Sequence, residues 1–459
     1  MSTGTLRTSL PPGPPGLPLI GQAPGFLRDP LGFLGGLAVT YGDVAYFRLG
    51  GIPVFFVNRP DYIWDVLVAQ RAKFEISIMR SRLEVGLGKG LLTSRSELHS
   101  RQRRLMQPVF RKSRIDSYAQ FMVDYTLRAR DGWHAGEEID ATEEMMKLTM
   151  SIVARSLFGH DIEEDAVAVS RNLGILLANF TRLMSPLRFT LMLPLPSSLR
   201  FHRAIRELDV VIYRMIEQRR RNPADGEDLL SLLVQAKDDE THAQMTEKQL
   251  RDEIFSLLMA GHETTANALS WALYLLAQNP DIDERLHAEV AKVMEGRQRL
   301  EPSDLNNLPY TRKVITEAMR LYPPGWFIGR TALEDVTVGG YTVPKGASVL
   351  FSQYVMHRDS RYFEEPGRFR PERWTEAFQD QLARGAFFPF SAGDRHCLGE
   401  GFAWLEVLLA LATLVERWKF ELVPGQAIRP NPSVTLRPNS GIRMIVRERK
   451  ARPDVAIKA

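Results

Sequence analysis

The chain has 459 residues, of which 44% are hydrophobic and 25% are charged. It contains no uncharged apolar run of about 18 residues and no signal-peptide pattern, so we expect a cytoplasmic protein without a membrane anchor. Its single cysteine excludes an internal disulfide and a cysteine-rich zinc site. The net charge of +4 is mild, and without a basic–aromatic recognition element we expect no nucleic-acid partner.

The predicted elements form one mainly α domain with small β-sheets over residues 1–459, because no linker or repeat divides the chain. Residues 1–20 form a proline-rich N-terminal arm that cannot continue a helix. Apolar runs separated by paired glycines predict two hairpins, one from the runs 44–47 and 53–57, the other from 336–338 and 341–343. Apolar residues at helical spacing predict helices at 118–133, 200–221, 246–278 and 281–295.

The turn-rich loop 387–401 brings Cys397 to the start of an apolar helix near Phe402. Helix N–H groups and Arg395 would favour a thiolate there, although a lone cysteine without further context is more often a small buried hydrophobe. The loop resembles the cytochrome P450 signature Phe-x-x-Gly-x-Arg-x-Cys-x-Gly at Phe390, Gly393, Arg395, Cys397 and Gly399. This resemblance implies the cytochrome P450 fold, haem b as the cofactor and Cys397 as the iron ligand.

Other motifs follow in the order that this family uses. Glu317 and Arg320 are spaced three apart on one helix face, which by itself is more typical of a solvated ion pair. The resemblance implies that they form a buried structural network with Arg373, in the segment Pro-Glu-Arg-Trp at 371–374.

The haem propionates would need cationic partners. His99 and Arg103 resemble the family's propionate-binding helix, and Arg330 and Arg395 match two further propionate ligands. An ordinary basic surface helix is the alternative interpretation of His99 and Arg103.

The predicted helix 246–278 resembles the family's oxygen-activating helix. Ala260 would leave room beside a prosthetic group, and a bond from the Thr264 hydroxyl to the Ala260 carbonyl would open the helix. The resemblance implies that Glu263 supplies protons from solvent and that Thr264 hydrogen-bonds during oxygen activation. Without the cysteine loop, Thr264 would be interpreted as a core threonine, and we assign no catalytic role to His262.

The resemblance also implies a substrate pocket lined by Met259, Trp326, Phe327, Thr435 and Leu436, each of which could singly be a core residue. Apolar lining suits a lipophilic substrate of the terpenoid, fatty acid or polyketide class.

We therefore expect a haem-thiolate monooxygenase that uses O₂ to oxidise a hydrophobic small molecule. Because the chain ends soon after the haem region, NAD(P)H electrons would come through a separate ferredoxin or flavodoxin and its reductase. We expect a monomer. A haem-thiolate peroxygenase or isomerase and a non-catalytic haem-binding protein are the alternatives.

Overall fold

The computed structural model describes residues 10–77, 83–159, 163–179, 182–183, 186–222, 228–238, 240 and 242–449. Residues 1–9 of the predicted proline-rich arm lie outside this part. The described residues form many helices and four small sheets, which confirms the expected fold class. No described helix is both long and apolar enough to cross a membrane.

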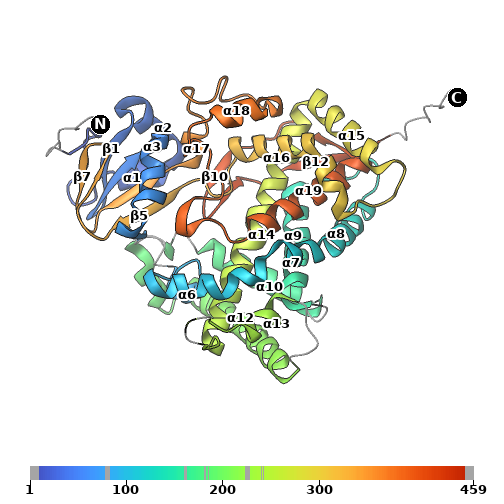
Figure 1. Cartoon of the computed structure of the whole chain (residues 1–459), viewed down its shortest axis with the longest axis horizontal. Helices are drawn as coiled ribbons and strands as arrows, with labels where there is room; N and C mark the ends of the chain where they lie inside the picture. Colours follow the sequence, from blue (N-terminus) through green and yellow to red (C-terminus); the bar gives the residue numbers. More distant parts are fainter. Residues whose placement is uncertain are drawn as a thin grey trace.

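Most of the chain is helical (Figure 1). The α-helices are α1 (Ala23–Arg28), α2 (Pro30–Tyr41), α3 (Pro60–Trp64), α5 (Glu84–Leu87), α6 (Ser96–Met106), α7 (Lys112–Ser117), α8 (Ala119–Asp131), α9 (Ala141–Phe158), α10 (Glu163–Ala178), α12 (Pro196–Arg221), α13 (Leu229–Gln235), α14 (Glu247–Gln278), α15 (Pro280–Met294), α16 (Pro309–Leu321), α17 (Gln353–Met356), α18 (Glu376–Gln381) and α19 (Glu400–Arg417). Shorter 3₁₀ or π turns are η1 (Asp65–Ala69), η2 (Arg71–Lys73), η3 (Gln107–Phe110), η5 (Pro186–Met192), η7 (Pro302–Asn307), η8 (Pro371–Arg373) and η9 (Gly393–Arg395).

The largest sheet has five strands in the order β1-β2-β8-β5-β3, with β2 and β8 parallel and the other pairs antiparallel. The other sheets have the orders β4-β12-β9, β6-β7 and β10-β11. The strands are β1 (Val44–Leu49), β2 (Ile52–Val57), β3 (Phe74–Ile76), β4 (Glu138–Asp140), β5 (Ile328–Ala332), β6 (Val336–Val338), β7 (Tyr341–Val343), β8 (Ser348–Phe351), β9 (Trp418–Leu422), β10 (Pro430–Pro432), β11 (Leu436–Pro438) and β12 (Arg443–Glu448).

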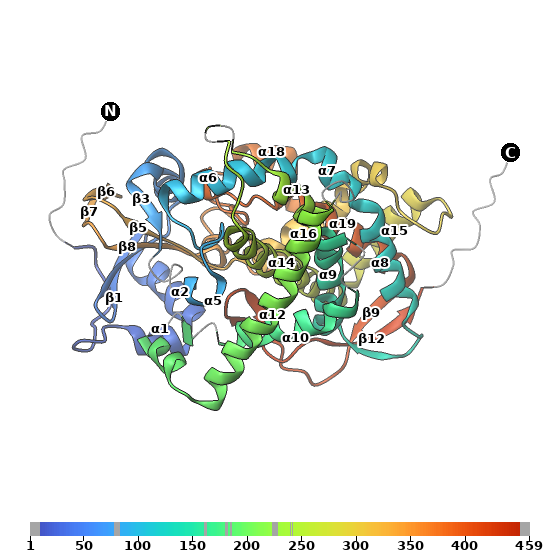
Figure 2. The same cartoon turned by 90° about the horizontal axis from the view of Figure 1, so that it is seen from below.

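The elements divide into a strand-rich side and a helical side. In Figures 1 and 2 the five-stranded sheet lies at the left with α1 and α2, and α8, α9, α15 and α19 lie at the right. The largest apolar cluster joins the helices, and two smaller clusters fill the two faces of the five-stranded sheet. The helical cluster therefore supplies the main core, with α14 running through it.

The central helix α14 begins and ends as its sequence predicts. The Thr246 hydroxyl accepts from the Gln249 N–H, and the Gln249 side chain accepts from the Thr246 N–H, which forms a capping box. The helix stops at Gln278, because Pro280 follows the Asn279 cap. Between these ends most of its side chains are buried on every side. A helix that is buried on every side lies in the middle of a large core, where its polar side chains need partners from other elements.

The other predicted elements agree with the structure to within a few residues. The helices at 118–133, 200–221 and 281–295 are α8, α12 and α15, and both predicted hairpins form. Several elements, including α9 and the sheet containing β4 and β12, were not predicted. The sheet forms because distant segments pair, as where β12 meets β4 across about 300 residues.

Two adjacent carboxylates of α14 hold the segment that precedes α6. Asp252 accepts from the Lys89 N–H (2.8 Å), and Glu253 accepts from the Leu91 N–H (2.8 Å). At Gly88, whose φ is +73°, a Cβ would come within 2.0 Å of the Asp252 carboxylate, so the close approach requires glycine. Burial raises the pKa of the Glu253 carboxyl to about 8. Glu253 is therefore a neutral acid at physiological pH.

Replacing Glu253 should change how stability depends on pH. In the folded chain the pKa of Glu253 is about 8, whereas the ordinary pKa of glutamate is 4.5. The contribution of this group to the free energy of unfolding is therefore greatest below pH 4.5 and declines until about pH 8. We expect Glu253→Gln to flatten that decline by a few kcal/mol, measured by urea unfolding at several pH values. Glu247→Gln, at an exposed position of the same helix, is the control. A pH-independent difference between parent and variant would contradict the burial argument.

Candidate active site

The loop that carries Cys397 is closed by its own backbone. The Cys397 N–H donates to the Phe390 carbonyl oxygen (2.9 Å), and the His396 N–H donates to that of Gly393 (3.0 Å). Gly393 has a φ of +69°, and a Cβ there would lie within 1.9 Å of the Leu67 carbonyl oxygen. Glycine is therefore required for the loop to pack on η1. This packing leaves Cys397 exposed.

The thiol also lies at the positive end of a helix. Cys397 stands three residues before α19, whose N-cap is Gly399. The first N–H groups of a helix have no partner inside it, and the helix dipole favours a negative charge there. Arg395, two residues before the cysteine in η9, adds a positive charge. These features favour the thiolate form of Cys397.

The predicted propionate-binding helix reaches the cysteine loop directly. Arg103 of α6 donates from Nη1 to the His396 carbonyl oxygen (2.7 Å), one residue before the thiol. His99 lies one turn earlier on the same helix and is buried. Arg330 is buried in the middle of β5. The four predicted cationic side chains thus come from two separate elements, α6 and β5, and from the cysteine loop.

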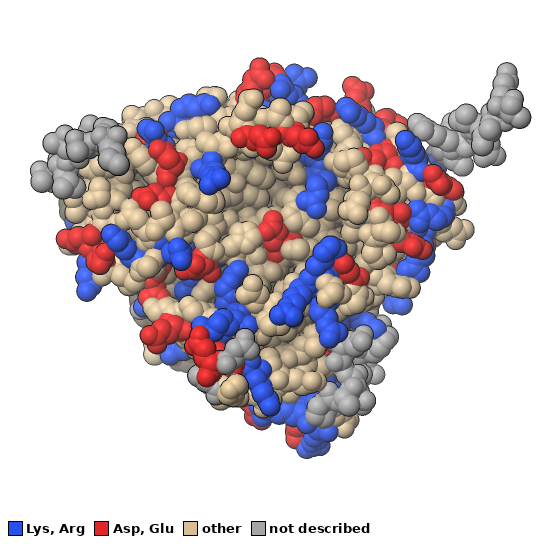
Figure 3. All heavy atoms as spheres, viewed as in Figure 1, with Lys and Arg blue, Asp and Glu red and all other residues tan. Residues whose placement is uncertain are grey.

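The molecular surface is hollowed near the middle of the face shown in Figure 3. Lysine and arginine side chains lie around this hollow, and acidic side chains lie at its upper edge and within it. Figures 1 and 2 show α6 on the same face of the molecule.

One face of the central helix α14 carries a narrow stripe of partly exposed residues, although the helix runs through the core. Leu257, Ala260 and Thr264 are partly exposed, although most residues around them are buried, and their spacing puts them on one helix face. The Thr264 hydroxyl donates to the Ala260 carbonyl oxygen (2.6 Å), as predicted. Thr265 makes the same kind of bond to Gly261 (2.8 Å). Two consecutive bonds of this type weaken the local helix ladder and favour a polar notch.

Glu263 does not face solvent, which differs from the predicted route of proton supply. Its side chain has no exposed surface. Oε1 accepts from Arg437 Nε (2.6 Å) and from Thr435 Oγ1 (2.6 Å), both in or beside β11. The physical reason is that a carboxylate inside an apolar core requires charged and hydrogen-bonding partners.

His262 belongs to the packing of α14. Its Nδ1 lies 2.8 Å from the Leu258 carbonyl oxygen, and its own carbonyl oxygen accepts from Thr149 of α9 (2.9 Å). Burial lowers the pKa of the His262 ring, so the ring is neutral. His262 therefore packs α14 against α9, and we assign it no role in the site.

The five predicted pocket residues lie at different depths. Phe327 is partly exposed, and the other four are buried. Trp326 and Leu436 pack in the apolar cluster that also contains residues of α1 and α2, which makes them core residues in this structure. Thr435 is bonded to Glu263, as described above. Its link to the acid was not predicted.

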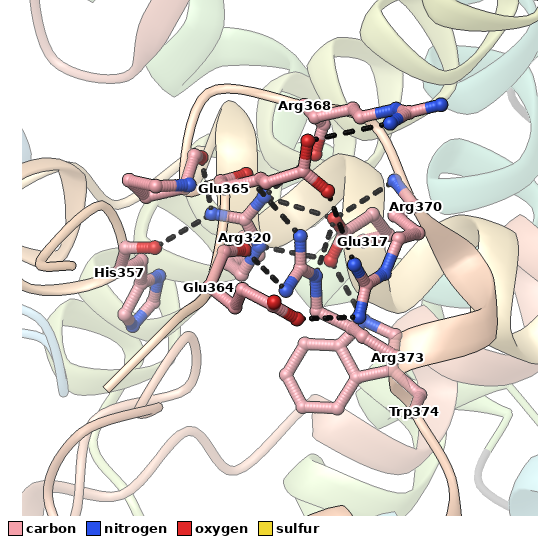
Figure 4. A network of polar contacts seen from close by, with 10 residues as sticks. Glu317, Arg320, His357, Glu364, Glu365, Arg368, Arg370, Arg373 and Trp374 are labelled. Atoms are coloured by element: carbon pink, nitrogen blue, oxygen red, sulfur yellow. Dashed lines mark hydrogen bonds and ion pairs between the residues drawn. The ribbon is translucent and has the colours of Figure 1, made fainter. Parts of the chain in front are cut away.

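A buried charge network is centred on Glu317 (Figure 4). Glu317 binds Arg320 through both carboxylate oxygens (2.8 and 2.9 Å) and accepts from Arg373 Nε (2.9 Å). Trp374 Nε1 and the Arg370 N–H also donate to it. The side chains of Glu317, Arg320, Arg373 and Trp374 are all buried. Every oxygen of the buried carboxylate is therefore paired.

His357 connects this network to the cysteine loop. Its carbonyl oxygen accepts from Arg320 Nη1 (2.8 Å), and its ring Nε2 accepts from the Phe388 N–H (3.1 Å). Burial, with a smaller contribution from Arg320, lowers the pKa of His357 well below its ordinary value. The ring is thus a neutral acceptor that fixes the start of the loop.

Sequence reasoning missed His357, Trp374 and Arg437. Trp374 could have been found, because it directly follows Arg373 in the quoted motif. His357 and Arg437 stand in no motif, and Arg437 lies 174 residues from its partner Glu263.

The donor set fits a haem. The chain's only cysteine is exposed at a helix N-terminus, so its thiol is accessible to a haem iron. Arg103 and Arg330 would supply cations for two propionates and His99 a ring N–H, and the stripe at Ala260 provides a surface that a flat macrocycle could contact.

Three comparisons agree with this geometry. The family model described as Cytochrome P450 matches residues 11–446. The chain is 39% identical to cyclooctatin synthase of Streptomyces melanosporofaciens over 94% of each chain, and 36% identical to cyclooctat-9-en-7-ol 5-monooxygenase of the same organism over 90% of each. It is 32% identical to pentalenene oxygenase of Streptomyces avermitilis, over 94% of this chain and 95% of that protein.

A solved structure with a similar fold is the retinoic-acid-bound cyanobacterial CYP120A1. The TM-score is 0.87 at 27% sequence identity, covering 96% of this chain and all of the other. The fold thus agrees with that of a known cytochrome P450, and the sequence matches the family model over nearly its whole length. The chain therefore belongs to the cytochrome P450 family, and it is a haem b monooxygenase that receives electrons through a redox partner.

Proposed function

We propose that the chain oxidises a lipophilic cyclic terpene, with Cys397 as the iron ligand and a separate ferredoxin or flavodoxin as the electron donor. The observation that carries the active-site assignment is the exposed Cys397 thiol at the N-terminus of α19. The substrate class is supported by two relatives whose names refer to cyclooctat-9-en-7-ol and pentalenene. Terpenes of this kind offer mainly apolar surface, which suits the apolar residues Met259 and Phe327.

The haem, when bound, supplies reductive activation of O₂. Cys397 would ligate its iron, and we assign its propionates to His99, Arg103, Arg330 and Arg395. The stripe of α14 would line the haem site. There the Thr264 hydroxyl can exchange its bond to Ala260 for a bond to a water molecule and so position a proton.

A ferrous–CO difference spectrum and a substrate screen test the assignment together. The parent should give the spectrum typical of a thiolate ligand, and cyclic terpenes should convert low-spin to high-spin haem. Cys397→Ala should lose the thiolate spectrum. Turnover with NAD(P)H and a redox partner should give oxygenated product. Product formed only with peroxide, or an unchanged spectrum in Cys397→Ala, would overturn the proposal.

Thr264→Ala should retain haem and bind substrate but divert electrons to hydrogen peroxide. The amount of product for each NAD(P)H consumed should fall several-fold, because the hydroxyl no longer positions a proton. Thr264→Ser keeps a hydroxyl and should restore most of the coupling. Thr265→Ala removes the neighbouring buried hydroxyl and is the matched control. Equal coupling in Thr264→Ala and the parent would remove Thr264 from the mechanism.

Arg103→Ala should weaken haem retention. It removes one cation from the propionates and the bond that holds the His396 carbonyl oxygen, a loss of about 1.5–3 kcal/mol. This corresponds to roughly ten- to hundred-fold weaker haem affinity, measured by haem transfer to an acceptor protein. Arg104→Ala is the control, since the neighbouring Arg104 pairs with Asp238 and Glu240. Equal haem loss from both variants would point to a general effect on α6.

A further inference from the structure

The segment 88–95 is fixed between the central helix and α6. On one side, the Asp252 and Glu253 carboxyl groups of α14 accept from two of its backbone N–H groups, each at 2.8 Å. On the other side, its Lys89 carbonyl oxygen accepts from Gln102 Nε2 of α6 (2.6 Å). Because α6 begins directly after this segment, the position of the segment also sets where the helix starts.

Helix α6 passes this constraint on to the cysteine loop. Gln102 stands next to Arg103, which donates to the His396 carbonyl oxygen (2.7 Å). His99, the other side chain of α6 that we assign to the propionates, lies one turn before Arg103. An unbroken series of hydrogen bonds and helix backbone thus joins the two carboxyl groups of α14 to the loop before the thiol. A movement of the segment 88–95 displaces the start of the helix that carries both assigned side chains.

Only one of the two carboxyl groups has a cation beside it. Asp252 binds Arg251 (2.9 Å), and Lys248 lies 3.8 Å from its second oxygen. Glu253 forms no ion pair within the described part of the chain, and burial, with a smaller contribution from Asp252, raises its pKa to about 8. The charged side chains that neighbouring elements bring to this end of α14 are engaged with other groups, Lys89 with Glu84 and Asp209 of α12 with Arg251. The core therefore holds Glu253 uncharged.

The contact between the segment and the two helices leaves polar atoms unsatisfied. Among the described residues, Glu253 Oε1, Gln102 Oε1 and Ser256 Oγ are buried without a hydrogen-bond partner. All three border the segment, since Ser256 Oγ lies against Gly90. Buried polar atoms are normally paired, and water can reach these three when the segment moves away. The held position is therefore one of low local stability, which depends on the state of Glu253.

We propose that Asp252 and Glu253 are positioning residues of the haem site: uncharged Glu253 holds the segment 88–95, and with it α6, in place for the propionates, and ionisation of Glu253 releases them. The proposal rests on the assignment of two propionate partners to α6 under the proposed function. On release the proton of Glu253 passes to water, whereas Asp252 keeps its charge and its partner Arg251. Haem retention is thereby coupled to a proton that lies far from the thiol in the sequence.

The coupling has a defined direction. The pKa of Glu253 is about 8 while the segment is held, whereas a glutamate released to solvent has the ordinary value of 4.5. The population of the released form therefore rises by up to about tenfold for each pH unit between 4.5 and 8, and it rises no further above pH 8. Low pH favours the held segment.

Haem transfer from the ferric holoenzyme to an acceptor protein measures the effect on the haem site. Between pH 6 and 8, the rate of haem loss from the parent should rise about ten- to hundred-fold relative to Glu253→Gln and then level off, because glutamine keeps an acceptor oxygen but cannot ionise. Glu247→Gln, at an exposed position of the same helix, should follow the parent. The same pH profile in Glu253→Gln and in the parent would overturn the proposal.

Glu253→Ala distinguishes the acceptor oxygen from the proton. It removes both, so haem loss should be faster than in Glu253→Gln at every pH, by a factor that does not change with pH. A residue that only fills space would give no pH-dependent difference between the parent and either variant. That result would contradict the role of ionisation.

Amide hydrogen exchange in the same holoenzyme reports on the segment directly. Peptides from residues 84–95 should exchange several-fold faster in the parent than in Glu253→Gln at pH 8, with a smaller difference at pH 5, when the two proteins are compared at equal pH. Peptides from α19 should show no such difference. Equal exchange of the segment in both proteins at pH 8 would overturn the proposal.

These measurements separate the positioning role from the propionate assignment. If Arg103→Ala retains haem as the parent does, the assignment to α6 fails and the coupling to haem fails with it, whereas the exchange comparison still decides whether Glu253 controls the segment. If Arg103→Ala loses haem and the segment exchanges equally in the parent and in Glu253→Gln, only the positioning role of Glu253 is overturned.

Discussion

The carboxylate of Glu317 and its two arginines form the interaction on which the haem side of the molecule depends. No water reaches this carboxylate, so its charge must be balanced by Arg320 and Arg373 and its oxygens filled by hydrogen bonds. Arg320 then uses its remaining N–H groups on the carbonyl oxygens of the 357–368 segment. One buried charge thereby fixes the backbone that leads to the cysteine loop (Figure 4).

The same electrostatic requirement recurs along α14. Glu263 is balanced by Arg437, whereas Glu253 forms no ion pair within the described part of the chain, and burial raises its pKa to about 8. Burial also raises the pKa of Glu406 in α19 well above its ordinary value. The helical core thus contains carboxyl groups of two kinds, one paired with arginine and the other neutral. Which kind a residue becomes depends on whether an arginine from another element reaches it.

The central helix α14 points two neighbouring side chains, Glu263 and Thr264, in different directions. Thr264 lies on the partly exposed stripe, and Glu263 points to the β10–β11 hairpin. Consecutive residues of a helix project about 100° apart, so an acid and an alcohol that are adjacent in sequence reach different surroundings. The partly exposed stripe therefore carries the alcohol, whereas the acid lies against the hairpin that contains Thr435 and Arg437. It also explains why the acid is not open to solvent in this structure.

The sequence by itself determined the family, the position of the thiol, the main helices and both glycine hairpins. These features depend on residues close together in the chain: the spacing around Cys397, the apolar period of 246–278 and the caps at Thr246 and Asn279. Only the tertiary structure decided the partner of Glu263, the role of His357 and the clamp from Asp252 and Glu253 to the segment before α6. Each is a contact between residues 31 to 174 positions apart. Local pattern cannot specify which distant donor meets a buried carboxylate, because that is set by how the whole core packs.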